Sequence, residues 1–225
     1  GYNVSIGYKT GGSASNSNVA IGQKAMGLQP AANENVAVGS VAGSNLIGGF
    51  TAIVGAQAGR HATGSYNTFM GYRAGYGSIT SAPFSSGQYN VAIGTEALRG
   101  FTTGYRNNII GYRAGYSTTT GYTNQYIGYY AGYYNTTGRA NTAIGANSQQ
   151  GASGQTDGDY NVSLGENSLF SLTTGNHNFV VGSNAGYSLT SGENNIIIGA
   201  SAGDALTTTS NSVMIGRSAG TAINS

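Results

Sequence analysis

The chain of 225 residues contains no cysteine and only two prolines, and few of its side chains carry a charge. The absence of cysteine excludes a disulfide framework, a thiolate metal site and a cysteine nucleophile. Collagen requires glycine at every third position and abundant proline, so the composition also excludes a collagen triple helix. Nine basic and seven acidic residues leave a net charge of +2. This charge is too small for the dense phosphate contacts of nucleic-acid binding.

Long hydrophobic runs are missing as well. Apolar stretches such as Ile196–Ile198 are far shorter than the roughly 20 residues that cross a bilayer, so we expect no membrane insertion. Leu, Ile, Val and Phe together number 40 residues, a low share that is typical of disorder only when the net charge is high. The chain starts at Gly1 without an initiator Met or a signal-peptide pattern. We therefore expect Gly1 to be a processed end or the edge of a fragment of a longer protein.

Glycine is abundant, with 39 residues, and it follows a period. An anchor glycine that follows Ile, Val, Leu or Met recurs thirteen times, and seven of the twelve intervals between copies are 17 residues. The anchor glycines are Gly7, Gly22, Gly39, Gly55, Gly71, Gly94, Gly111, Gly128, Gly145, Gly165, Gly182, Gly199 and Gly216. The two longest intervals are 23 and 20 residues. The pattern predicts one repeat domain over residues 1–225, with about 13 coils and insertions at about 77–88 and 149–159.

Fixed positions around the anchor glycine predict the fold. Asn stands four residues before it in eleven copies, and a small residue stands three residues after it in all thirteen. Short β-branched segments between glycines favour strands over helices, and glycine permits the positive φ of corners. Stacked Asn side chains can form ladders. We therefore predict an all-β fold, a β-solenoid of the parallel β-roll or β-helix type. The aliphatic residue before the anchor and the small residue after it are expected to point inward.

A coil with one large and one small inward residue builds a thin core. Little apolar area is then buried per residue, and a single thin solenoid would be marginally stable. We therefore expect the chain to pack or intertwine with two sister chains as a homotrimer.

The repeat resembles those of known extracellular proteins. Asn18–Gly22, Asn35–Gly39, Asn90–Gly94 and Asn141–Gly145 look like the head repeat of trimeric autotransporter adhesins, which form left-handed parallel β-rolls and bind host matrix as trimers. The longer unit in Thr102–Gly115 is more similar to repeats in phage tail fibres and related virion appendages. In those fibres the repeat often precedes a self-cleaving chaperone domain.

The resemblance implies a structural protein without catalytic activity or a cofactor. It would form the shaft or head of a homotrimeric tail fibre or similar appendage, on a virion or outside the cell. Its partners would be a glycan or protein receptor on a host cell and other proteins of the virion or appendage. A bacterial surface adhesin head and a polysaccharide-degrading tailspike are the alternatives.

Titratable residues are too sparse to predict a catalytic or metal site. His61 and His177 lie more than a hundred residues apart, and Glu96 has no carboxylate nearby in the sequence with which to form a glycosidase pair. Asp157 and Asp159 form the one close acidic pair. Calcium takes six or more oxygens, so this pair is either part of a calcium site or a solvated loop.

Tyrosine carries the clearest functional signal, because thirteen of the 17 tyrosines lie between Tyr66 and Tyr134. They recur at fixed positions after the anchor glycine, and arginines accompany them. Stacked coils would turn these positions into ladders that either fill corners and trimer seams or form a receptor surface. The insertion that contains Phe84 lies beside them, and loops on rigid scaffolds often bind ligands. The candidate receptor-binding residues are Tyr72, Arg73, Tyr76, Phe84, Tyr112, Arg113, Tyr116, Tyr129 and Tyr133.

Overall fold

A computed structural model describes residues 2–11, 16–27, 33–78, 85–151 and 157–221. The chain forms two compact units, residues 1–113 and residues 114–225. The first unit contains strands β1 (Val4–Ile6), β2 (Val19–Ile21), β3 (Val36–Val38), β4 (Ala52–Val54), β5 (Thr68–Met70), β6 (Val91–Ile93) and β7 (Asn108–Ile110). The second contains β8 (Gln125–Ile127), β9 (Thr142–Ile144), β10 (Val162–Leu164), β11 (Phe179–Val181), β12 (Ile196–Ile198) and β13 (Val213–Ile215). Within the described ranges, no helix has the length and apolar character needed to cross a membrane.

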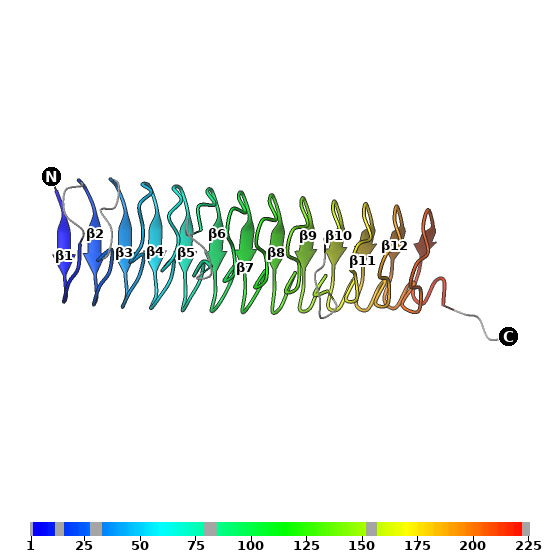
Figure 1. The fold of residues 1–225 in the computed structure, drawn as a ribbon. Helices are drawn as coiled ribbons and strands as arrows, with labels where there is room; N and C mark the ends of the chain where they lie inside the picture. The colour runs from blue at the N-terminus through cyan, green and yellow to red at the C-terminus, as the bar shows by residue number, and fades with distance from the viewer. Residues whose placement is uncertain (1, 12–15, 28–32, 79–84, 152–156, 222–225) are drawn as a thin grey trace. The chain divides into compact units, whose positions relative to one another are not determined.

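Within each unit the strands stack in the order of the sequence (Figure 1). Each strand pairs in parallel with the next, and equivalent positions of the repeat face one another, as in Val19 with Val36. There are six consecutive pairings in the first unit and five in the second. This arrangement confirms the predicted all-β solenoid and its spacing of about 17 residues. The single domain over the whole chain stays a prediction.

In strands β2 to β12 the inward residue is the middle one. Ile53 in β4 and Phe69 in β5 are fully buried, whereas Val54 and Met70, which precede their anchor glycines, are 38% and 46% exposed. The prediction that the aliphatic residue before the anchor points inward is therefore wrong. Side chains alternate between the two faces of a strand, so a buried middle residue sends both of its neighbours outward.

Two further positions complete the interior of each coil. The small residue three after the anchor is buried as predicted, for example in Ala58 and Ala74. A position seven after the anchor also points inward and holds residues such as Leu46 and Phe101. The Phe101 ring meets that of Phe69 with centroids 5.5 Å apart. The core is thus wider than the two inward positions expected from the sequence.

The anchor position requires glycine for two reasons. Gly39 has a φ of +139°, which L-residues rarely adopt. A Cβ atom there would also lie 2.5 Å from the carbonyl oxygen of Gly55 in the next coil. Other left-handed positions hold residues with side chains, which the sequence pattern did not predict. They lie five before and two after the anchor, as in Tyr66 and Arg73, with φ of 59° and 54°, and in some coils four after it, as in Leu98 with φ of 50°.

A buried asparagine ladder links the coils, as predicted. The backbone N–H of Asn90 donates to Oδ1 of Asn67 at 2.9 Å, and the backbone N–H of Asn107 donates to Oδ1 of Asn90 at 3.0 Å. The Asn90 side-chain amide also donates to the carbonyl oxygen of Gly104 at 2.9 Å. Each amide thus satisfies backbone groups of neighbouring coils that the short strands leave unpaired.

Candidate functional site

Acidic and histidine side chains do not gather into a metal-binding cluster. In the described part of the chain, no three His, Cys, Asp or Glu side chains come together as a possible metal site. Glu96 instead pairs with two arginines: its Oε2 lies 2.7 Å from Nε of Arg113, and its Oε1 lies 3.4 Å from Nε of Arg99. Glu96 thus neutralises arginines of its own and the next coil.

The acidic pair bonds to the preceding coil. Asp157 accepts hydrogen bonds from the Thr136 and Thr137 hydroxyls at 2.8 and 2.7 Å. Burial alone would raise the pKa of Asp157, but the hydrogen bonds from Thr137 and Thr136 together outweigh it and hold the pKa below its ordinary value. Asp159 forms an ion pair with Arg139, with Oδ2 2.9 Å from Nε. Both carboxylates therefore connect coils and do not converge on one point.

Both histidines contact aromatic rings. His61 packs edge-on against Tyr76, with centroids 4.9 Å apart, and its Nδ1 lies 3.0 Å from the Asn45 amide nitrogen. Burial, with a smaller contribution from nearby Arg60, lowers the pKa of His61. His177 is exposed and stacks on Tyr160 at 5.0 Å. In the described part of the chain, both histidines thus pack against tyrosine rings.

Three predicted receptor residues form a cluster in the first unit. The Arg73 guanidinium lies over the Tyr72 and Tyr76 rings, 5.0 and 5.4 Å from their centroids. Tyr72 is exposed, whereas Tyr76 is nearly buried between Arg73, Arg99 and His61. The geometry therefore gives Tyr76 a packing role and leaves Tyr72 facing solvent.

Tyr112 and Arg113 form a second cluster of the same unit. Arg113 lies over the exposed Tyr112 ring at 5.2 Å and bonds to Glu96. Glu96 and Arg113 stand at the same repeat position of successive coils, so this position pairs opposite charges there. Arg73, two coils earlier, donates instead to Oε1 of Gln57 at 2.9 Å.

The remaining predicted residues lie in the second unit, except for Phe84. Tyr116 stacks on Tyr133 with centroids 5.0 Å apart, and Tyr130 bridges Tyr129 and Tyr133 through edge contacts. These rings form a continuous aromatic group, as the repeat positions predicted. Phe84 lies outside the described residues.

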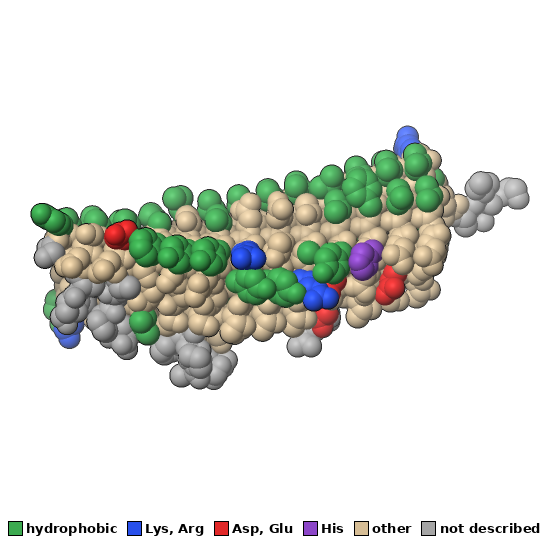
Figure 2. All heavy atoms as spheres, turned by 90° about the horizontal axis from the view of Figure 1, so that it is seen from above, with side chains coloured by type: hydrophobic (Ala, Val, Ile, Leu, Met, Phe, Trp, Pro, Cys, Tyr) green, Lys and Arg blue, Asp and Glu red, His purple; other side chains and the backbone are tan. Residues whose placement is uncertain are grey.

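Sequence reasoning missed a ladder of exposed rings five residues before the anchor glycine. Phe50, Tyr66 and Tyr89 stack in consecutive coils of the first unit, with centroids 5.1 and 4.9 Å apart and rings within 4° of parallel. Figure 2 shows hydrophobic side chains lying in rows on one face of the molecule. Alignment of this position in three successive copies would have revealed the ladder.

One open pocket lies at the end of this aromatic ladder. It has a volume of about 320 Å³ and is lined by Ser86, Gly87, Gln88, Tyr89, Thr103, Tyr105 and Arg106. The backbone of Arg106 donates to the Gln88 carbonyl at 3.0 Å, which holds the two coils together beneath the pocket. The lining combines two phenol rings, polar groups and one arginine.

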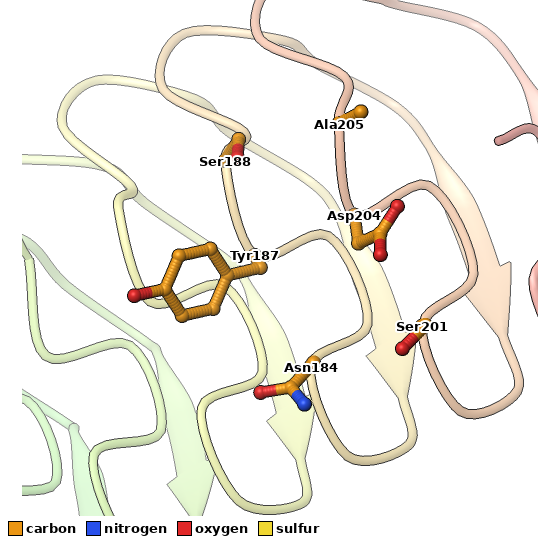
Figure 3. Close-up of a pocket in the computed structure, with 6 residues that line it drawn as sticks. All are labelled: Asn184, Tyr187, Ser188, Ser201, Asp204 and Ala205. Carbon is orange, nitrogen blue, oxygen red and sulfur yellow. The ribbon is translucent and has the colours of Figure 1, made fainter. Parts of the chain in front are cut away.

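A second open pocket lies between coils of the second unit (Figure 3). It measures about 450 Å³ and is lined by Asn184, Tyr187, Ser188, Ser201, Asp204 and Ala205. Tyr187 stacks on Phe170 at 4.8 Å, and Asn184 accepts a hydrogen bond from Asn167. This pocket offers a single carboxylate, so it lacks the acid and base pair of a glycosidase.

Comparison of the chain with protein-family models, curated proteins and solved structures finds no match.

Proposed function

We propose that this chain is a structural fibre protein: the shaft or head of a homotrimeric tail fibre or similar appendage, on a virion or at a cell surface. It attaches to a glycan or protein receptor on a host cell. The observation that carries this proposal is the apolar outer face of the strands. On a single chain such a face exposes apolar side chains to water, whereas in an assembly the face is buried between chains.

The outer face is apolar because of the residues on either side of each buried middle position. In the first unit Val4, Ile6, Val36, Val54 and Met70 are exposed there, and in the second unit Ile144, Phe179, Ile196, Val213 and Ile215 are exposed. Seven strands at about 4.8 Å spacing extend this face over about 29 Å in the first unit alone. Apolar patches of this extent on soluble proteins mark interfaces.

Copies of the same chain are the partners that fit this face best. Apolar side chains recur along it at the spacing of the coils, and a sister solenoid presents the same spacing. Three copies that turn these faces toward a common axis would bury, in each unit, the aliphatic residues that precede the anchor glycines. The exposed Tyr72 and Tyr112 lie next to the anchor glycines and flank this face as receptor contacts.

The oligomeric state tests the proposal. Sedimentation velocity of the chain should give a trimer, and the double variant Ile144→Lys with Ile196→Lys should give a monomer. Ser191→Lys, at an exposed position away from the strands, is the matched control and should remain trimeric. A wild-type chain that sediments as a monomer at micromolar concentration would overturn the proposal.

A further inference from the structure

We propose that the pocket formed by Tyr89, Tyr105 and Arg106 binds an acidic saccharide, with Arg106 contacting its carboxylate and Tyr89 its apolar ring face. This inference rests on the proposed role in host attachment and names the chemical class of the receptor. It adds to the predicted receptor contacts three residues that the repeat pattern did not single out.

The aromatic ladder ends in an open ring face. Phe50 and Tyr66 are each covered by the ring of the next coil, and Tyr89 is the last ring. Arg106 occupies the same repeat position one coil further, yet its guanidinium lies over Tyr105, 5.8 Å from the centroid. The face of Tyr89 that points away from Tyr66 is therefore left to the pocket. Sugar rings present C–H groups that pack against such aromatic faces.

Within the described ranges, the Arg106 side chain has no acidic or amide partner, unlike three of the other four arginines of its unit. The fourth, Arg60, donates to the Tyr76 hydroxyl at 3.5 Å. Arg113 and Arg99 share Glu96, and Arg73 bonds to Gln57. Within the described ranges, the Arg106 guanidinium contacts only the Tyr105 ring. A planar guanidinium with free donors is suited to a carboxylate, which it can bind through two parallel hydrogen bonds.

The size and lining of the pocket suit one or two sugar rings. Its volume of about 320 Å³ is near the lower end of known small-molecule sites. Gln88, Thr103 and Ser86 supply amide and hydroxyl groups at its wall. These groups can both donate and accept hydrogen bonds, as saccharide hydroxyls require.

The backbone conformation at these ring positions is a second, independent argument that the rings take part in binding. Tyr66, Tyr89 and Arg106 all have left-handed φ, between 54° and 59°. The equivalent position in the second unit holds Asn194 and Asn211 as well as Tyr160 and His177. Asn tolerates this conformation better than aromatic residues do. Exposed aromatic side chains at a strained position add little to the core, which favours a role in binding.

The probes are a tetrasaccharide containing glucuronic acid and its carboxyl-reduced counterpart, titrated into the assembled protein and followed by NMR. We expect the acidic probe to bind at least ten times more tightly than the reduced one. Arg106→Gln should remove that preference, and Tyr89→Ala should weaken the binding of both probes. Arg217→Gln makes the same change of charge at an exposed arginine outside the pocket and should leave binding unchanged.

Three results would each overturn the proposed saccharide site. They are equal binding of the two probes, no binding of either probe, and undiminished binding of the acidic probe by the Arg106→Gln variant. Host-cell binding by the trimer that survives periodate oxidation of host glycans would overturn it as well, in favour of a protein receptor. Those results leave the fibre proposal standing, because its failure appears separately as a monomer or as loss of all host-cell binding.

Discussion

The interior of the second unit is partly polar in its first coils, beside the buried Tyr126, Ala131 and Ala143, and aliphatic in its later ones. Residues 118–168 place buried polar side chains at inward positions, namely Thr118, Asn135, Ser148, Ser163 and Ser168. From Leu169 onward the buried cluster is aliphatic and contains Leu169, Leu172, Val180, Ala185, Leu189, Ile197 and Ala202. The same repeat positions are involved, since Asn135 and Leu172 both stand seven residues after an anchor glycine.

The coil keeps its shape across this change because its backbone connections do not change. The backbone N–H of Asn141 donates to Oδ1 of Asn124 at 3.0 Å in the polar region, and Asn195 makes the same bond to Asn178 at 3.1 Å in the apolar region. The ladder and the strand pairing therefore specify the coil. The inward side chains determine how much free energy each coil contributes.

The largest expected effect on stability comes from replacing an inward aliphatic residue with the polar residue that stands at the same repeat position in the polar region. Leu172→Asn should lower the free energy of unfolding by about 2–5 kcal/mol, because it deletes buried methyl groups and buries an amide. Chemical denaturation measures the loss, and hydrogen exchange should show it concentrated in residues 169–202. Leu172→Met, which keeps the volume, is the control and should cost less than about 1.5 kcal/mol. A loss below that value for Leu172→Asn would contradict the assigned role of the aliphatic cluster.

The period of the repeat was predictable because two separate constraints, the backbone φ and the contact with the next coil, require glycine at the anchor position. The φ of Gly39 is one that other residues rarely adopt, and a Cβ atom there would collide with the carbonyl oxygen of Gly55. Every copy of the repeat therefore keeps glycine at this position. The asparagine ladder was predictable for a similar reason, since few side chains can bond to two neighbouring coils at once.

Which side chains of each strand point inward could not be predicted from a single sequence. In Asn-Val-Ala-Ile-Gly the large residues suggest the core, yet Ala20 and Ala37 are the buried ones. Most outward strand positions are apolar, as the inward ones are, so hydrophobicity alone cannot tell the two faces apart. The pocket beside Arg106 was also hidden, because it depends on which neighbouring ring the guanidinium contacts.

The reverse exchange should stabilise the polar region. Within the described residues, both polar atoms of the Asn135 side chain are buried without a hydrogen-bond partner. Asn135→Leu should raise the free energy of unfolding by about 1–3 kcal/mol, since it removes that desolvation penalty. Asn135→Asp, which buries a charge instead, should destabilise the coil. Thermal and chemical denaturation measure both, and a destabilised Asn135→Leu would mean that the polar interior is required for folding.

A serine cluster tests whether the polar interior is held by its own hydrogen bonds. The Ser148 hydroxyl lies 2.7 Å from that of Ser163 and 3.2 Å from that of Ser168. Ser148→Ala should cost about 1 kcal/mol, because it removes the buried hydrogen bonds of its hydroxyl with Ser163 and Ser168. The double variant with Ser163→Ala should cost less than the sum of the two single variants, measured as a double-mutant cycle. Additive costs would show that the hydroxyls act independently.

The smallest effect concerns Asp157, which connects the polar region to the preceding coil from outside. Hydrogen bonds from Thr136 and Thr137 hold its folded pKa below the ordinary value. The carboxylate therefore stabilises the fold above the unfolded pKa of about 4, and that contribution is lost as pH falls through the folded pKa. Asp157→Asn should remove this part of the acid sensitivity, measured as the difference in unfolding midpoint between pH 6 and pH 3. Asp204→Asn is the control, because the Asp204 carboxylate accepts no hydrogen bond from the described residues. A variant as acid-sensitive as the wild type would show that the threonine bonds do not stabilise this coil.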